Sequence, residues 1–313
     1  MARTADDSWD IATSVGATAV MVALARAAET ASAEPLIQDR FAEPLVSTPE
    51  LEGVREQVAA WWSAEPDEGE ETGQAPDGAM RAQEMINYQA VRTHFFDAYF
   101  ADAVAAGIRQ AVIVAAGLDS RAYRLDWPAG TVVYEIDLPK VLEYKAETLA
   151  GHGATPVADR REVPVDLRHD WPQALRDAGF DASQPTAWLA EGLLPFLPAS
   201  AQEALFASID ALSGSGSRVA VENFGVDPDK RRAAEERWHE LKAKREARGQ
   251  DTSFNPFDLW FSDEGRPECA DWFATHGWTT STLNARDEGQ RLGRAPQSED
   301  RPFLNSFVTA TKS

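Results

Sequence analysis

Two residues that follow neighbouring apolar segments have the types and spacing of a nucleoside site. Ala111–Ala115 is a short apolar run, typical of a buried parallel strand, and Gly117 comes just after it. The β-branched segment Thr131–Ile136 ends at Asp137, twenty positions after Gly117. A glycine lets the backbone turn sharply beneath a ligand, and an acid at the end of the second strand can accept both ribose hydroxyls. The pair therefore indicates nucleoside binding; the alternative is that Asp137 only caps a helix starting at Pro139.

The turn around Gly117 favours a nucleoside that carries no pyrophosphate. It lacks the pattern G-x-G-x-x-G, because Ala115 and Asp119 stand where a dinucleotide-binding turn would have glycines. Bare glycines allow the backbone to approach two phosphates closely, so their absence weakens the case for NAD or NADP. S-adenosylmethionine has ribose and adenine but carries a sulfonium and an amino-acid tail in place of phosphates. A nicotinamide-dependent oxidoreductase on a similar sheet stays an alternative.

Other catalytic motifs are missing from the sequence. The five histidines never fall at H-x-x-x-H spacing, and the single cysteine, Cys269, can form neither an internal disulfide nor a cysteine-based metal site. We therefore expect no metal. The chain also has no G-x-S-x-G nucleophile elbow and no G-x-x-x-x-G-K-[ST] phosphate loop.

The elements that must position Gly117 and Asp137 alternate between strands and helices. Strands are predicted at 111–115, 131–136, 163–165, 186–190, 217–222, 278–283 and 303–310, and helices between them at 139–149, 171–178 and 199–212. This alternation predicts an α/β fold with a doubly wound, mostly parallel sheet. Helical spacing at 15–29, 51–62 and 79–100 predicts three helices before the first strand.

We expect the 313 residues to form one domain. Its parts are a helical N-terminal cap over 1–105, a cofactor-binding α/β core over 106–225, a helical insertion over 226–270 and C-terminal strands over 271–313. Within the cap, residues 65–78 are acidic and turn-rich and hold no basic residue, which predicts a surface loop. The charged segment 228–248 predicts an exposed helix, with a lid over the site as the functional alternative.

Four ordered sequence blocks follow the predicted strands. They are Ala-Gly-Leu-Asp-Ser-Arg-Ala-Tyr-Arg-Leu over 116–125, Glu-Ile-Asp-Leu-Pro over 135–139, Val-Asp-Leu-Arg over 165–168 and Ala-Glu-Gly-Leu-Leu-Pro-Phe-Leu over 190–197. Together with segments 14–19, 35–42 and 92–97, they resemble the leucine carboxyl methyltransferase family, in particular its bacterial branch. The resemblance runs from about Trp9 to Glu222. It implies a class I (Rossmann-like) methyltransferase fold with a seven-stranded sheet and S-adenosylmethionine as the cofactor.

The resemblance also implies which residues hold the nucleoside part of this cofactor. Gly117 would line its methionine part, and Asp137 would hold the ribose hydroxyls. Asp166 would accept from the adenine amino group, and Leu167 beside it would offer a backbone amide to the ring. The alternative for Asp166 is that it caps the segment before Trp171.

Two further positions are implied at the amino-acid end of the cofactor. Arg92 would pair with the cofactor carboxylate, for which a guanidinium fork is well suited. Glu191 would face the cofactor's amino group or the region of methyl transfer. The alternatives are that Arg92 pairs with Asp97 or another nearby acid, and that Glu191 is a buried structural acid.

The implied activity is S-adenosylmethionine-dependent methyl transfer, and we expect O-methylation of a carboxylate or hydroxyl on a small molecule. The sulfonium already activates the methyl group, so alignment with the acceptor and exclusion of water supply most of the catalysis. A carboxylate is ionised at neutral pH and needs no base. A hydroxyl would need one, and Glu191 is the candidate catalytic residue. A protein that binds the cofactor as a regulator without turnover is a second alternative to methyl transfer.

The net charge limits the partners. The chain holds 51 acidic and 30 basic residues, a formal charge of −21, and residues 1–105 alone hold 19 acidic and 6 basic ones. Such a chain would repel nucleic acid and anionic membrane surfaces. A highly acidic acceptor is also disfavoured, unless Arg92, Arg121, Arg124 and the basic helix predicted over 228–248 form a local positive mouth. No apolar stretch approaches the roughly 20 residues of a membrane helix, and the first residues lack the basic region of a secretory signal, so we expect a cytoplasmic protein. The oligomeric state is not indicated by the sequence.

Overall fold

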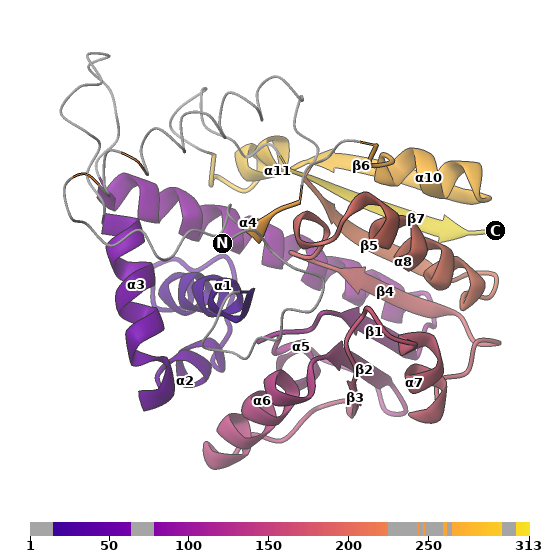
Figure 1. Cartoon of the computed structure of the whole chain (residues 1–313), viewed down its shortest axis with the longest axis horizontal. Coiled ribbons are helices and arrows are strands. Elements are labelled where there is room, and N and C mark those ends of the chain that lie inside the picture. Colours follow the sequence, from indigo (N-terminus) through magenta and orange to yellow (C-terminus); the bar gives the residue numbers. More distant parts are fainter. Residues whose placement is uncertain are drawn as a thin grey trace.

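The structure is a computed structural model that describes residues 15–63, 78–224, 243, 247, 259–261, 265–295 and 305–313 (Figure 1). The acidic loop predicted at 65–78 and the inserted helix predicted at 228–248 lie outside these residues, apart from Gly78, Ala243 and Ala247. Within the described part of the chain, no helix combines the length and the apolar composition that crossing a bilayer requires.

A seven-stranded sheet forms the centre of the molecule. Its strands are β1 (Gln110–Val114), β2 (Val132–Asp137), β3 (Asp159–Pro164), β4 (Thr186–Ala190), β5 (Arg218–Asn223), β6 (Trp278–Asn284) and β7 (Ser306–Lys312). Their order across the sheet is β3-β2-β1-β4-β5-β7-β6. The first five strands pair in parallel, and β7 lies antiparallel between β5 and β6. This confirms the predicted doubly wound, mostly parallel sheet of class I methyltransferase type.

Alternation along the strands divides the core between the two faces of the sheet. In β1, Ala111 and Ile113 join one apolar cluster, while Val112 and Val114 join the other. Successive side chains of a strand point to opposite faces, so a continuous apolar run requires helices on both sides. β1 is buried along its whole length, as a central parallel strand must be.

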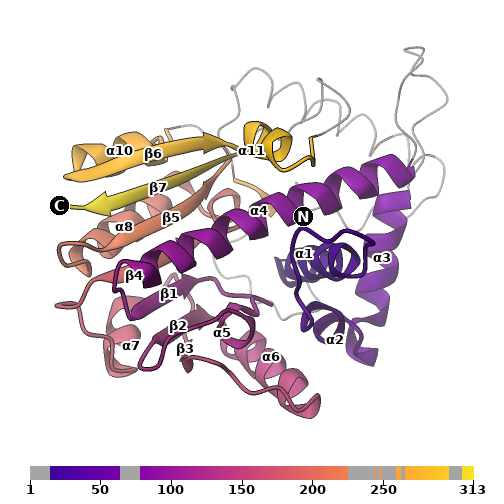
Figure 2. The same ribbon diagram turned by 180° about the vertical axis from the view of Figure 1, so that it is seen from behind.

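Helices cover both faces. One face carries α1 (Val15–Thr30), α2 (Ala42–Val46), α3 (Glu52–Ser63), α4 (Gly78–Ala105), α5 (Arg121–Arg124), α6 (Pro139–Gly151) and α11 (Ala285–Arg291), and the other carries α7 (Trp171–Asp177), α8 (Ala199–Ala211) and α10 (Cys269–Thr275). Figure 2 shows the long helix α4 crossing in front of the sheet, with α1, α2 and α3 to one side of its N-terminal half. Because α4 packs on β4 and β5, the N-terminal helices and the sheet share one core, which supports the proposal of a single domain.

Two predicted strands differ from the structure in an informative way. β1 ends at Val114 because Ala115 adopts a left-handed conformation with φ of 54°, which a strand cannot continue. β3 starts at Asp159, earlier than the predicted 163–165, and its first residues are polar. A strand at the edge of the sheet has less apolar cover than a central one, so its hydrophobic signal is weaker.

Candidate functional site

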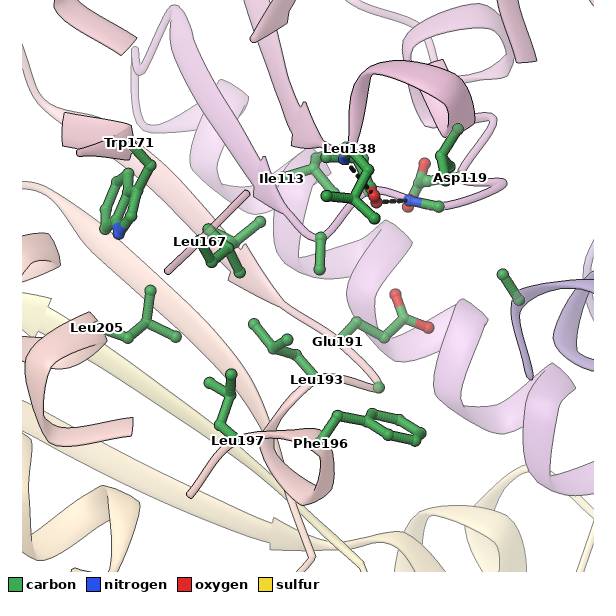
Figure 3. Close-up of a pocket in the computed structure, with 18 of the residues that line it drawn as sticks. Ile113, Asp119, Leu138, Leu167, Trp171, Glu191, Leu193, Phe196, Leu197 and Leu205 are labelled. Carbon is green, nitrogen blue, oxygen red and sulfur yellow. Dashed lines mark hydrogen bonds between the residues drawn. The ribbon is translucent and has the colours of Figure 1, made fainter. Parts of the chain in front are cut away.

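A cavity of about 700 Å³ lies at the carboxyl ends of the parallel strands (Figure 3). Ligands bind at this edge in open α/β sheets because the strand-to-helix loops gather there. The walls of the cavity include all six residues that the sequence analysis singled out: Arg92, Gly117, Asp137, Asp166, Leu167 and Glu191. They come from α4 and from the ends of β1, β2, β3 and β4.

Asp137 connects the first two strand-to-helix turns. Its Oδ2 accepts from the backbone N–H of Gly117 at 2.6 Å, and its Oδ1 accepts from the N–H of Leu138 at 2.7 Å. The N-cap of α6 is Leu138, which makes no side-chain cap bond. The carboxylate therefore braces the Gly117 turn rather than capping α6. Burial raises the pKa of Asp137 above its usual range, and the two N–H donors offset this only in part.

The backbone at Gly117 is held in a conformation that favours glycine. Its φ is +47°, and a Cβ added there would lie 3.4 Å from the Cβ of Ala19 on α1. A side chain at this position would thus be strained and would crowd the helix above it. The backbone of the turn is left bare toward the cavity.

Asp166 and Leu167 lie in the loop between β3 and α7. The Asp166 carboxylate binds Arg168 through Nε at 3.0 Å and Nη2 at 2.6 Å. Burial raises the pKa of Asp166, but the hydrogen bonds from Arg168 outweigh it, so the pKa lies below its usual value. The residue that caps α7 is Asp170, which accepts from the N–H of Gln173 at 3.1 Å. Asp166 does not cap α7, but its Oδ1 accepts from the backbone N–H of Arg168 at 2.9 Å, so it closes the turn before Trp171 as that alternative held.

Arg92 and Glu191 form an ion pair at the other end of the cavity. Arg92 Nε lies 2.7 Å from Glu191 Oε1, and Arg92 Nη1 donates to Glu222 Oε2 at 3.0 Å. The suggested pairing of Arg92 with Asp97 is not the one formed, because Asp97 binds Arg121 and Arg124. Arg92 does pair with nearby acids, as that alternative required, and only 5 % of its surface is exposed.

Arg121 is a functional candidate that the sequence analysis did not assign. It lines the cavity, and its Nη1 lies 2.7 Å from Glu191 Oε2 and 2.5 Å from Asp119 Oδ2, while its Nε donates to Asp97 at 2.7 Å. Glu191 is thus bound by guanidinium groups on both oxygens. Arg121 and Asp119 belong to the block over 116–125, but nothing in their spacing predicts partners from α4 and β4.

The arginines do not form a free positive mouth. The structure pairs Arg92, Arg121 and Arg124 with carboxylates. A further ion pair joins Arg26 on α1 to the buried Asp39 at 2.9 Å, and Arg26 Nη2 also donates to the carbonyl of Leu118 at 2.7 Å. The N-terminal helix is therefore tied to the turn that holds Gly117.

The remaining walls are mostly apolar. In Figure 3, Leu138, Leu167 and Leu193 surround the middle of the cavity, with Trp171, Leu197 and Leu205 further along and Phe196 beside Glu191. Helix α1 adds Gly16, Thr18, Ala19 and Val22. The sequence analysis treated Leu193, Phe196 and Leu197 only as part of a family block, since apolar residues after a strand are equally typical of core. Among the residues that the structure describes, no three His, Cys, Asp or Glu side chains are grouped so that they could hold a metal ion.

Comparison with known proteins identifies relatives of this chain. A model of the leucine carboxyl methyltransferase family matches residues 19–210. A protein of Mycobacterium marinum named "Putative S-adenosyl-L-methionine-dependent methyltransferase" is 73% identical over 315 residues and covers 100% of both chains. One of the same name from Mycobacterium ulcerans is 72% identical, also over 100% of both chains. The crystal structure of a DUF574 family protein from Streptomyces avermitilis has the same fold, with a TM-score of 0.51 at 15% identity over 91% of this chain and 99% of that one.

Proposed function

This chain belongs to the leucine carboxyl methyltransferase family, and on that basis we propose that it transfers a methyl group from S-adenosylmethionine to an oxygen of a small molecule. One observation carries the proposal: the six residues to which the resemblance gives cofactor roles, spread from 92 to 191 along the chain, line a single cavity at the ligand-binding edge of the sheet. Its volume of about 700 Å³ is within the ordinary range for small-molecule sites.

The nucleoside end of the cavity fits the cofactor. An ionised carboxylate has about four lone-pair sites, and Asp137 uses two of them on backbone N–H groups, which leaves acceptors for ribose hydroxyls. The side chains of Leu138, Leu167 and Leu193 (Figure 3) offer apolar contact for adenine. The adenine amino group would donate to Asp166, which also lines the cavity.

The cavity end at Arg92 and Glu191 fits the amino-acid part of the cofactor, which carries a carboxylate and an ammonium group. Arg92 uses Nε and Nη1 on glutamates, and its Nη2 makes no bond to the residues that the structure describes, so it is available to the cofactor carboxylate. Glu191 supplies a negative charge for the amino group. The bare backbone at Gly117 leaves room for the methionine chain between them.

The cavity supports an acceptor that is ionised before it binds. The carboxylates that line it are all hydrogen-bonded: Asp119 to Arg121, Asp137 to the N–H groups of Gly117 and Leu138, Asp166 to Arg168, Asp170 to the N–H of Gln173, and Glu191 to Arg121. A general base must bring a free oxygen to the proton of the acceptor, and guanidinium groups hold both oxygens of Glu191. We therefore favour a carboxylate acceptor over a hydroxyl.

Bound S-adenosylmethionine supplies an electrophilic methyl group, and the residues of this chain align it and keep water away. Helix α1 covers the Gly117 turn, and its contacts through Arg26 to Asp39 and Leu118 hold it there. The cover restricts water at the place where the acceptor oxygen and the methyl group must meet in line.

Calorimetric titration with S-adenosylhomocysteine, NADH and NADPH tests the cofactor. Binding of S-adenosylhomocysteine supports the proposal, and binding of a nicotinamide nucleotide without it would favour the oxidoreductase. Release of S-adenosylhomocysteine from S-adenosylmethionine, measured over a panel of carboxylic acids and phenols, then tests the acceptor. Release with phenols alone would contradict the carboxylate preference, and binding without release from any acceptor or cell extract would favour a regulatory protein.

A further inference from the structure

Glu222 is a fully buried carboxylate at the end of β5, directly behind the cofactor site. It is 0% exposed, and it does not belong to the walls of the cavity among the described residues. Its Oε2 accepts from Arg92 Nη1 at 3.0 Å and from the backbone N–H of Gly192 at 2.8 Å. Its Oε1 accepts from the hydroxyl of Tyr88 and from Asn305 Nδ2, the latter at 2.9 Å. Four donors from three parts of the chain therefore converge on this one side chain.

Two of these donors belong to the proposed cofactor site. Arg92 is the partner proposed for the cofactor carboxylate, and Gly192 follows Glu191, the partner proposed for the amino group. Gly192 has a φ of +66°, and a Cβ there would lie 3.7 Å from Arg92 Nη1. The backbone after Glu191 thus approaches the guanidinium closely, and Glu222 binds both.

We propose that Glu222 is a positioning residue that orients Arg92 and the backbone after Glu191 to receive the amino-acid end of the cofactor. The inference rests on the proposed function, since it assumes that Arg92 meets a ligand carboxylate. Tyr88 and Asn305 hold Glu222 through Oε1, the oxygen that Arg92 does not bind. Tyr88 is placed for this by α4, because it lies one helical turn before Arg92.

A carboxylate is needed here because all four groups donate. A glutamine at 222 would offer one acceptor oxygen and one NH₂ group, so its NH₂ would face either Arg92 and Gly192 or Tyr88 and Asn305. An NH₂ turned toward Arg92 and Gly192 faces two obligatory donors, whereas one turned toward Tyr88 can donate to its hydroxyl; either orientation removes the charge that holds the guanidinium. The substitution E222Q therefore disturbs Arg92 while it changes the side-chain volume little.

The test compares two ligands in each protein: S-adenosylhomocysteine, which has the amino-acid tail, and 5′-methylthioadenosine, which lacks it. A residue that acts through Arg92 affects only the first ligand, whereas general damage to the fold affects both. The matched control is E135Q. Glu135 is also 0% exposed and lies on β2, and it is ion-paired with Lys145 at 2.9 Å and Arg160 at 2.6 Å.

We expect E222Q to bind S-adenosylhomocysteine at least tenfold more weakly than the unsubstituted protein does. Its affinity for methylthioadenosine should change less than twofold. The control E135Q should change the ratio of the two affinities by less than twofold. Equal losses for both ligands in E222Q, or no loss for either, would overturn the positioning role.

If E222Q does not fold, Tyr88→Phe decides, because it removes one donor to Glu222 and keeps the ring. A loss confined to S-adenosylhomocysteine supports the role, and unchanged affinity for both contradicts it. An unsubstituted protein that binds neither ligand would overturn the proposed function itself, and this inference with it.

Discussion

The carboxylate of Asp137 accepts a 2.6 Å hydrogen bond from the backbone N–H of Gly117. The two residues that spacing alone pairs in the sequence are therefore in direct contact, each at the end of one of two adjacent parallel strands. The same carboxylate that is proposed to hold the ribose also fixes the turn beneath the methionine chain. Cofactor binding and the shape of that turn are thus coupled through one side chain.

The substitution Asp137→Ala is expected to weaken S-adenosylhomocysteine binding by about 100-fold or more. Two hydrogen bonds to a charged acceptor are lost, and each contributes about 1.5–3 kcal/mol. Isothermal titration calorimetry measures the change. Asp159→Ala, at the start of β3, serves as the control and should leave the affinity unchanged. A folded Asp137→Ala protein with undiminished affinity would remove Asp137 from the site.

The affinity should also depend on pH through Asp137. Burial raises the pKa of this carboxyl, so it takes up a proton at a higher pH than an ordinary aspartate does. The neutral form is a poorer acceptor for ribose hydroxyls, and we expect affinity to fall as the pH decreases through the raised pKa. The free energy of unfolding changes with pH in the opposite direction from the affinity. The raised pKa of Asp137 stabilises the folded protein at pH values below the pKa of an unfolded aspartate, and this contribution is lost as the pH rises through the pKa in the folded protein. Calorimetry on Asp137→Asn at several pH values should lack this titration, and an identical pH dependence would assign it to another group.

Replacement of Glu191 by glutamine separates binding from base catalysis. Both oxygens of Glu191 are bound by arginines, so the proposed role is to attract the cofactor's amino group rather than to remove a proton. We expect Glu191→Gln to raise the KM for S-adenosylmethionine while the shape of the pH profile of kcat stays that of the unsubstituted enzyme. Loss of the ionisation on the acidic limb of that profile, where activity falls as the pH decreases, would instead make Glu191 a general base and favour a hydroxyl acceptor.

The buried pair of Arg26 and Asp39 should stabilise the attachment of α1. Burial alone would raise the pKa of Asp39, but the charges of Arg26 and Arg124 outweigh it and hold the pKa below its usual value. Asp39→Ala should lower the free energy of unfolding by about 3–5 kcal/mol at neutral pH, because it leaves a buried guanidinium without its partner. A lowered pKa contributes stability above the unfolded value of about 3.9 and loses it as the pH falls. Urea unfolding at pH 7 and near pH 3.5 should therefore give a smaller difference at the lower pH. Asp102→Asn, at an exposed position, is the control. An equal loss of unfolding free energy in this variant would contradict a stabilising role of the Arg26–Asp39 pair.

Ala115 offers a test of backbone strain at the cofactor turn. Its φ of 54° costs a residue with a Cβ about 1–2 kcal/mol, whereas glycine adopts this conformation freely but loses more entropy on folding. Ala115→Gly should therefore be neutral or more stable by up to about 1 kcal/mol, and Ala115→Val should be clearly less stable. Urea unfolding of the three proteins gives the order, and a marked loss of stability in Ala115→Gly would contradict it.

The sequence predicts the sheet well because its central strands are buried on both faces. β4 has the bounds predicted for it, Thr186–Ala190, since a short β-branched and apolar run between Pro185 and Glu191 leaves little choice. The short helices α5, α10 and α11 were not predicted. A helix of four to seven residues completes at most two turns and gives only a weak periodicity, although α7, also seven residues long, was predicted.

The candidate site was predictable only where a residue belongs to a recognisable block. Gly117 and Asp137 follow strands, and their chemistry can be read from that position. Glu222 could not be assigned, because its partners Tyr88 and Asn305 lie 134 and 83 residues away along the chain. Hydrogen bonds over such separations depend on how helices pack on the sheet, which local sequence does not encode.

The place of β7 has a consequence for the order in which the sheet assembles. β6 lies at the edge of the sheet and pairs with β7, which comes later in the chain, so β6 has no template until β7 has joined β5. Asn305, which immediately precedes β7, reaches Glu222 only at that stage. During synthesis, the parallel half of the sheet can form as each strand emerges, whereas the support behind Arg92 is completed only after β7 has left the ribosome. A nascent chain interrupted before residue 305 would contain the Gly117 turn and Arg92, but Glu222 would lack its hydrogen bond from Asn305.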